Sequence, residues 1–247
     1  MKYAVYVEGK AELLFVSDVL AKYSNYDPMV VGFRCINLND DSFEYVQFPM
    51  QGDVETSRDF YQIVNVNNDG LVISKLRKDI PNLVKQGYEI IVGLRDVFSA
   101  DYKLLCTHQQ VNMELISEMH EVQSDQLNVV EGADVRLHYA IMEYETWMMA
   151  LMGNYVSSKG GDFAKILEKI GIDSNSDFEQ EIYHPYNKVQ EVYKAVNERY
   201  GKHESDHLAF LASVSVADYE KLRHSGRCAS FKHFIDSLLL NITNKVL

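Results

Sequence analysis

The stretch Tyr3–Glu12 reads YAVYVEGKAE and decides how the chain begins to fold. Its first five residues form an apolar run, too short for an independent helix and rich in β-branched and aromatic side chains, which predicts a strand buried on both faces of a parallel sheet. Gly9 permits a sharp turn, and apolar residues at helical spacing from Ala11 to Tyr23 predict a helix after it. Glu8 then stands at the carboxyl end of the strand, where ligands bind in open α/β sheets.

A second acidic residue follows closely, because Glu12 lies four residues beyond Glu8 in the first turn of the expected helix. Two carboxylates that converge on one crevice point to a divalent metal or to acid–base chemistry. The alternative is that both side chains only complement the positive end of the helix dipole. This stretch by itself leaves both interpretations open.

The composition of the 247 residues is that of an ordinary globular protein, with 47% hydrophobic and 24% charged residues. No apolar run approaches the roughly 20 residues needed to cross a bilayer, and the N-terminus lacks the layout of a signal peptide. The three cysteines, Cys35, Cys106 and Cys228, are far apart and show no CxxC spacing. They are typical of buried thiols in a reducing compartment, so we expect a cytoplasmic protein without a membrane partner.

The net charge of −12 bears on any nucleic-acid hypothesis. Proteins that bind nucleic acid usually carry a basic surface that displaces counterions from phosphate. Here binding would require a local basic patch, bridging metal ions or a basic partner subunit. The candidate patch is Lys10 together with Lys75, Arg77 and Lys78 of the helix expected at 71–85, although lysines and arginines on a helix are usually a solvated face.

Further strands and helices alternate through the first 152 residues. Strands are expected at 29–36, 60–66, 88–94 and 134–142, and helices at 71–85, at 107–121 and from 146 onward. The acidic, aperiodic segment 37–59 predicts a long loop or insertion, and Asn67–Gly70 is a strong turn signal. We therefore expect an α/β domain over 1–152 with a mostly parallel sheet flanked by helices.

The strand signals stop at about residue 153. Helical spacing predicts four helices, at 163–170, 188–200, 208–220 and 231–240. The region 153–247 is therefore expected to be helical and to pack on the α/β domain.

Acidic residues recur where strands are expected to end. Asp96 follows the strand at 88–94, and Glu143 and Glu145 follow the strand at 134–142. With Glu8 after the first strand, acidic residues follow three predicted strands of one α/β series. This recurrence favours a shared site at the carboxyl edge of the sheet. Alternation places Glu143 and Glu145 on similar sides of an extended segment but not of a helix, so we expect only one of them, Glu143, to line the site.

Several segments resemble, in order and spacing, a family of small stand-alone bacterial TOPRIM proteins, related to OLD-type nucleases, primases and topoisomerases. Val7–Glu12 is similar to the family's signature after the first strand, and Leu94–Asp96 to the place of its aspartates. Tyr139–Trp147 (YAIMEYETW) resembles a block with two glutamates around an aromatic residue. Asn187–Lys188 and Cys228–Phe231 are similar to two later segments.

The resemblance implies a TOPRIM-like fold and a Mg²⁺- or Mn²⁺-dependent site. Phe98 stands where TOPRIM enzymes carry a second aspartate, so Asp101, Glu143 or Glu145 would have to complete the metal shell, and Ala11 replaces a frequent hydroxyl residue. Glu8 is expected as a metal ligand or general base, Asp96 as the principal ligand, and Lys188 as the cation that offsets charge on the scissile phosphate. The implied metal ligands are Glu8, Glu12, Asp96, Asp101, Glu143 and Glu145.

A competing motif occurs at His203–His207, which reads HESDH and satisfies the zincin pattern HExxH. Taken literally it predicts a zinc metalloprotease with Glu220 as a conceivable third ligand. The preceding residues look like a helix end, however, and Phe210 stands where the longer metzincin pattern requires glycine. A polar helix start is the alternative interpretation.

Three functions follow from these patterns. The leading expectation is a metal-dependent hydrolase, a TOPRIM nuclease that cleaves DNA or RNA, with a role in anti-phage defence by family analogy. The alternative is a catalytically weak regulatory or scaffolding subunit that works with an ATPase partner; assembly as a homo-oligomer is a further candidate. The zinc metalloprotease is the minor alternative.

Overall fold

A computed structural model describes residues 1–39, 42–46, 52, 55–68, 70–106, 108–128 and 131–242 of the chain. Residues 40–41, 47–51 and 53–54 of the expected loop lie outside the described residues, as do Asp69 of the predicted turn and Thr107 at the start of an expected helix. The chain forms two compact units. The first comprises Met1–Arg95, Ser117–Tyr139 and Asp236–Leu247, and the second comprises Asp96–Ile116 and Ala140–Ile235.

A six-stranded sheet in the order β3-β2-β4-β1-β5-β6 organises the first unit. Neighbouring pairs among β2, β4, β1 and β5 are parallel, and β3 is antiparallel to β2. Hydrogen bonds from Asp134 N to Glu89 O and from Val97 N to Ala140 O, near the two ends of the pair, show that β6 runs parallel to β5. The mostly parallel α/β fold expected from the sequence is thereby confirmed. The strands are β1 (Lys2–Val7), β2 (Val31–Asn39), β3 (Ser42–Val46), β4 (Asp59–Asn65), β5 (Ile90–Asp96) and β6 (Asp134–Ala140).

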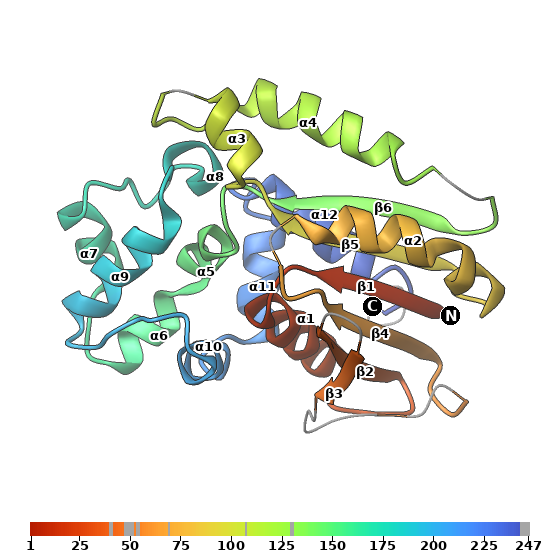
Figure 1. Ribbon diagram of the computed structural model, residues 1–247. Coiled ribbons are helices and arrows are strands. Elements are labelled where there is room, and N and C mark those ends of the chain that lie inside the picture. Colours follow the sequence, from red (N-terminus) through yellow and green to blue (C-terminus); the bar gives the residue numbers. More distant parts are fainter. Residues whose placement is uncertain are drawn as a thin grey trace. The chain divides into compact units, whose positions relative to one another are not determined.

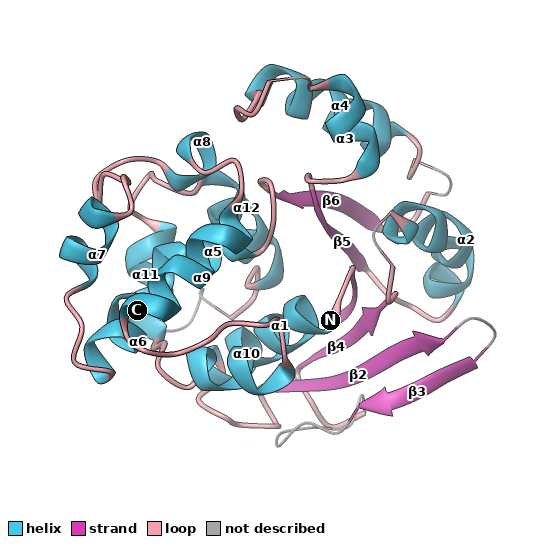
Figure 2. Ribbon diagram, turned by 60° about the vertical axis from the view of Figure 1, so that its left-hand side comes forward, coloured by secondary structure: helices cyan, strands magenta, loops and turns pink. Residues whose placement is uncertain are grey.

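Helices α1 (Lys10–Tyr23) and α2 (Leu71–Lys85) cover opposite faces of this sheet (Figure 2). The connection through α1 runs from β1 past β4 to β2, whereas the connection through α2 runs from β4 past β1 to β5. Crossovers between parallel strands are right-handed as a rule, and right-handed connections that move in opposite directions along a sheet place their helices on opposite faces. Burial on both faces explains why β1 is an unbroken apolar run.

The side chains of β1 alternate between the two faces. Tyr6 reaches the α2 side, where its hydroxyl donates to Asp79 Oδ2 at 2.9 Å. Tyr3 stacks on Tyr61 of β4 with ring centroids 4.2 Å apart, and the Tyr61 hydroxyl donates to Leu238 O. The buried aromatic residues of these strands therefore satisfy their hydroxyl groups inside the unit.

Gly93 in β5 allows α2 to pack closely on the sheet. A Cβ at this position would lie 2.6 Å from Leu76 Cδ1 and 3.3 Å from Val72 Cγ1, both on α2. Leu76 and Val72 are fully buried. Glycine is therefore required here by the approach of the helix rather than by backbone conformation.

Two expectations for the first half of the chain need correction. The segment 37–59 is not a loop throughout, because β3 lies within it and pairs with β2. The aperiodic polarity of β3 fits its place at the edge of the sheet that the described residues form. The helix expected at 107–121 is α4 (Met113–Asp125), and the short helix α3 (Ala100–Leu105) precedes it, started by Ser99, whose hydroxyl accepts from Tyr102 N.

The second unit is helical beyond the ends of β5 and β6, as expected from the loss of strand signals. The helix predicted at 208–220 is instead two helices, because Ser215 starts a new helix as its N-cap, with its hydroxyl accepting from Asp218 N. The helices are α5 (Glu145–Leu151), α6 (Gly153–Ser158), α7 (Phe163–Lys169), α8 (Phe178–Glu181), α9 (Pro185–Ala195), α10 (Glu204–Leu211), α11 (Val216–Arg223) and α12 (Ala229–Leu238) (Figure 1).

Trp147 of α5 is the largest buried side chain of the second unit. Its ring packs against Phe231 and Phe234 of α12, and its Nε1 donates to Glu179 of α8 and to Ser230 of α12. The indole thus fixes the position of α5, whose first residue is Glu145.

The expected domain division at residue 152 falls between α5 and α6, inside the second unit. As a statement about domains it stays a prediction. Among the described residues, no helix combines the length and apolar character needed to span a bilayer.

Candidate metal centre

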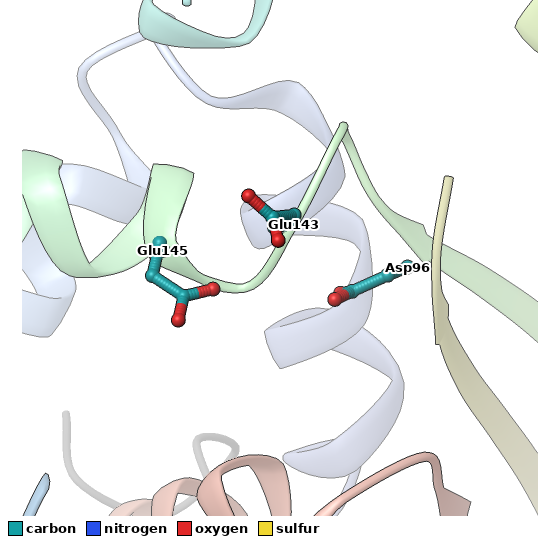
Figure 3. A group of neighbouring side chains, drawn as sticks. All are labelled: Asp96, Glu143 and Glu145. Carbon is teal, nitrogen blue, oxygen red and sulfur yellow. The ribbon is translucent and has the colours of Figure 1, made fainter. Parts of the chain in front are cut away.

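Three carboxylates of the second unit form an acidic cluster, which we define as Asp96, Glu143 and Glu145. Each offers one oxygen atom, and these oxygen atoms all lie within 4.8 Å of one another. Figure 3 shows the three side chains directed toward a common space: Asp96 from the end of β5, Glu143 from the segment that joins β6 to α5, and Glu145 from the start of α5. Glu145 is 3% exposed and Glu143 is 16% exposed.

Backbone hydrogen bonds bring the segment after β5 against the segment after β6. Val97 N donates to Ala140 O at 3.2 Å, and Phe98 N donates to Met142 O at 2.7 Å. Tyr144 N donates to Asp96 Oδ1 at 2.9 Å, which fixes the Asp96 carboxylate directly. Asp96 is thus held beside the two glutamates by main-chain contacts.

The turn between β6 and α5 places both glutamates in the acidic cluster. Met142 has a φ of 63°, in the left-handed region, so the chain turns sharply two residues after the end of β6. Thr146 N donates to Glu143 O, and the Thr146 hydroxyl donates to Ile141 O, which closes the first turn of α5. Glu143 and Glu145 therefore do not belong to one extended segment, and both offer an oxygen atom to the acidic cluster. The expectation that Glu143 alone lines a functional site stays a prediction.

Lys202 supplies positive charge to the acidic cluster. Its Nζ lies 2.9 Å from Glu145 Oε1 and 3.3 Å from Glu143 Oε1, and 5.0 Å from the centroid of the Tyr186 ring. Burial lowers the pKa of Lys202, but the charges of Glu145 and Glu143 outweigh burial, and the pKa is raised overall. The amine is therefore held as an ammonium.

The turn that carries Lys202 is fixed on both sides. Asp206 Oδ2 accepts from Gly201 N at 2.8 Å and from His203 N at 3.1 Å. Lys202 itself has a φ of 58°. On the preceding side, the Tyr200 hydroxyl donates to Glu145 Oε1 at 2.8 Å, and burial together with the Glu145 charge raises the pKa of Tyr200 well above its ordinary value. Tyr200 therefore remains a donor to Glu145 at any physiological pH.

The formal charges of this group leave an excess of negative charge. Three carboxylates (−3) and one ammonium (+1) sum to −2. One divalent cation would balance this charge. Carboxylate oxygens are the ligands that Mg²⁺ prefers, and the partial exposure of Glu143 leaves room for the waters that Mg²⁺ retains. The donor set thus fits a hard divalent cation.

Glu8 and Glu12 belong to the first unit and are both buried, at 5% and 7% exposure. Glu8 Oε1 accepts from Gly70 N at 3.3 Å and lies 3.6 Å from Arg95 Nε. Arg95 also donates to Gln123, which accepts from the Tyr139 hydroxyl. Glu8 thus has a structural ion pair at the carboxyl end of β1, and its membership of a metal shell with Asp96 stays a prediction.

Other predicted site residues lie outside the acidic cluster. Asp101 is exposed in the first turn of α3. Lys188 of α9 donates to Ile170 O at 3.0 Å and pairs with Glu191 at 3.2 Å. Lys75 of α2 is half-buried, and Lys10, Arg77 and Lys78 are exposed. The metal role of Asp101 and the phosphate role of these four cations stay predictions.

The HExxH pattern begins outside a helix, because His203 is the N-cap of α10. His203 and Glu204 are exposed, whereas His207 is 2% exposed, so the two histidines do not present one common ligand face. Among the described residues, the group with three or more metal-ligating side chains close together is the acidic cluster. The polar helix start is thus the interpretation that the local geometry favours.

Sequence reasoning missed Lys202, Tyr200 and Arg95. Lys202 is 57 residues beyond Glu145, in a turn whose letters carry no pattern of their own, and the left-handed backbone of a lysine has no sequence signature. Arg95 could have been recognised, because it directly precedes the candidate ligand Asp96 and because a buried carboxylate such as Glu8 needs a cation nearby.

Comparisons with protein-family models, with curated proteins and with solved structures find no match for this chain. The fold and the geometry therefore define its class by themselves. It is an α/β protein with a six-stranded, mostly parallel sheet and a cluster of three carboxylates that includes the last residue of β5.

Proposed function

We propose that this protein is a Mg²⁺- or Mn²⁺-dependent nuclease of the TOPRIM type that hydrolyses phosphodiester bonds of DNA or RNA. The observation that carries the proposal is the acidic cluster, with three carboxylate oxygens within 4.8 Å of one another. Its position supports the same class of chemistry, because Asp96 ends a parallel strand, where α/β proteins bind ligands.

The residues of the acidic cluster have distinct parts in this proposal. A bound Mg²⁺ supplies Lewis-acid stabilisation of the phosphoryl group. Asp96 and Glu145 hold the cation, with Tyr144 N and the Tyr200 hydroxyl keeping their carboxylates in place. Glu143, the more exposed glutamate, is the ligand that reaches toward substrate.

Lys202 fits the role that the sequence suggested for Lys188. The Lys188 amine is engaged with Ile170 O and Glu191, whereas the Lys202 amine contacts the acidic cluster and is 43% exposed. An ammonium beside the cation can offset charge that develops on a scissile phosphate. We propose Lys202 for this contact, and Lys10, Lys75, Arg77 and Lys78 as contacts to the nucleic-acid backbone.

The test is cleavage of plasmid DNA, single-stranded DNA and tRNA by purified protein with Mn²⁺ or Mg²⁺. The wild type is expected to cleave at least one substrate, and Asp96→Asn is expected to abolish cleavage. Asp125→Asn is the matched control, because Asp125 is exposed at the end of α4. Wild-type protein without cleavage of any substrate, or an active Asp96→Asn variant, would contradict the proposal.

One observation favours a second candidate, a regulatory or scaffolding subunit that works with an ATPase partner. Lys202 already pairs with Glu143 and Glu145, so the fold itself neutralises part of the cluster without a cation. If Mg²⁺ leaves the melting temperature unchanged and no nucleic acid is cleaved, this candidate replaces the nuclease. Anti-phage defence is a proposed setting for either candidate and rests on family analogy.

A further inference from the structure

A cavity of about 480 Å³, partly open to solvent, lies in the second unit and is lined by residues other than the acidic cluster. Its walls come from the C-terminal half of α5, the start of α6, and from α7, α8 and α11. Helix α5 packs against α8 and α11, and α6 packs against α7, which brings these walls together. Its volume is within the range of small-molecule sites in proteins.

About half of the cavity wall is apolar. Leu151, Leu167, Phe178 and Leu222 are buried side chains that line it, and Phe163 is half-buried at its wall. Two phenyl rings among the lining residues suit the apolar or aromatic body of a small organic molecule. An inorganic ion alone would leave this apolar surface uncovered.

The charged side chains of the wall carry a net positive charge. Lys221 and Arg227 line the cavity together with Asp218. The Asp218 carboxylate is engaged inside the protein, because its Oδ2 accepts from Ser215 N at 2.8 Å, from the Ser215 hydroxyl at 2.6 Å and from Asn154 Nδ2 at 2.8 Å. These neutral donors fix the carboxylate but leave its negative charge, so Lys221, Arg227 and Asp218 together give the wall a formal charge of +1.

Lys221 is the more exposed of the two cations that line the cavity. Its amine makes no hydrogen bond or ion pair with any described residue. Arg227 donates through one nitrogen to Ser174 O, lies 5.5 Å from the centroid of the Phe178 ring and attracts Asp177. A guanidinium has five N–H donors, so Arg227 retains donors for a ligand.

We propose that this cavity binds a small organic anion, with its anionic group on Lys221 and Arg227 and its apolar body against Phe163, Phe178 and the leucines. A carboxylate and a phosphate monoester share this chemistry. The proposal is independent of the nuclease, since it uses none of the residues of the acidic cluster.

The test is a titration of full-length protein, labelled at leucine methyl groups, with phenyl phosphate and with benzoate. Saturable shifts are expected at Leu151, Leu167 and Leu222, but not at Leu208, which does not line the cavity. Benzyl alcohol, which lacks the charge, and inorganic phosphate, which lacks the apolar body, are expected to bind at least about tenfold more weakly than the better aromatic anion. Tighter binding of phenyl phosphate would indicate a phosphate site, and tighter binding of benzoate would indicate a carboxylate site.

Two variants locate the anion. Lys221→Met is expected to weaken binding of the better aromatic anion about tenfold, whereas the matched Lys194→Met, on an exposed lysine of α9, leaves it unchanged. Ala164→Phe, at an exposed position of the wall, is expected to abolish binding by filling the cavity. Absence of saturable shifts, equal binding by Lys221→Met, or equal binding of inorganic phosphate or benzyl alcohol would overturn the proposal.

Discussion

Replacing Lys202 by methionine is expected to strengthen divalent-cation binding at the acidic cluster and to destabilise the cation-free protein. The Lys202 ammonium lies 2.9 Å from Glu145 Oε1 and 3.3 Å from Glu143 Oε1. It therefore repels any cation that the same oxygens bind. Without it the formal charge of the group changes from −2 to −3.

The size of the effect follows from distance and exposure. A Mg²⁺ ion about 2 Å from its oxygens would stand roughly 4–5 Å from the Lys202 nitrogen. Charges of +2 and +1 at that separation repel by about 2 kcal/mol in water, the appropriate limit for a side chain that is 43% exposed. Because the lysine can also swing into solvent, the expected gain in affinity is about tenfold.

The stability of the cation-free variant should move the other way. Glu145 is 3% exposed and loses its nearest cation, although Tyr200 still donates to it. The expected loss is about 1–2 kcal/mol, which lowers the melting temperature by about 5 °C. Addition of Mg²⁺ should then raise the melting temperature of Lys202→Met more than that of the wild type.

The assay is calorimetric titration with Mn²⁺ and Mg²⁺, combined with thermal denaturation with and without cation. Lys188→Met is the matched control, because the Lys188 amine contacts Ile170 O and Glu191 instead of the acidic cluster. Unchanged or weaker cation binding by Lys202→Met would refute the electrostatic reasoning. If Lys202 also contacts phosphate, cleavage by the variant falls while its cation affinity rises.

Three further predictions follow from other parts of the molecule. Glu145→Gln should weaken Mn²⁺ binding at least about tenfold and abolish cleavage, because it removes a buried ligand charge. Gly93→Ala should destabilise the protein by about 1–3 kcal/mol in urea unfolding, since its Cβ would lie 2.6 Å from Leu76 Cδ1. Burial lowers the pKa of His207 to about 4, so the folded protein holds this imidazole neutral. The stability that depends on the neutral imidazole is therefore fully present above pH 6.5 and is lost as the pH falls toward 4. The free energy of unfolding should fall by up to about 3 kcal/mol over this range.

Each of these predictions has its own control. Glu118→Gln on the exposed face of α4 should bind Mn²⁺ as the wild type does, and equal affinity of Glu145→Gln would contradict the ligand assignment. Gly153→Ala, whose Cβ would have its nearest neighbour at 4.0 Å, should be tolerated; a Gly93→Ala variant of wild-type stability would show that α2 can shift. His207→Leu should lose less stability than the wild type between pH 7 and pH 4, and parallel curves would refute the assignment to His207.

Much of the fold could be predicted because burial leaves a local pattern. β1 and α1 follow directly from YAVYV and the helical spacing after it, and α2 was expected with its bounds, Leu71–Lys85. The edge strand β3 has no such pattern, because it is paired on one side and its described side chains are largely exposed. The break between α10 and α11 depends on the Ser215 cap, which apolar periodicity does not report.

The acidic cluster could be predicted in part. Asp96, Glu143 and Glu145 were found because each follows a predicted strand, and strand ends are visible in sequence. The role of Lys202 could not be predicted from the sequence. Its contact with Glu145 of α5 arises from the packing of the helices in the second unit, which places the turn at residues 201–203 beside α5. The separation of the two glutamates into a turn and a helix start was likewise hidden, since it depends on the left-handed backbone of Met142.

The most direct test of the central claim is calorimetric titration of the wild type and of Asp96→Asn with Mn²⁺. We expect one saturable site in the wild type and at least about a tenfold loss of affinity in Asp96→Asn, because the variant removes one of three carboxylates. A wild type that binds no Mn²⁺, or a variant that binds it equally well, would contradict the claim that these carboxylates hold a cation.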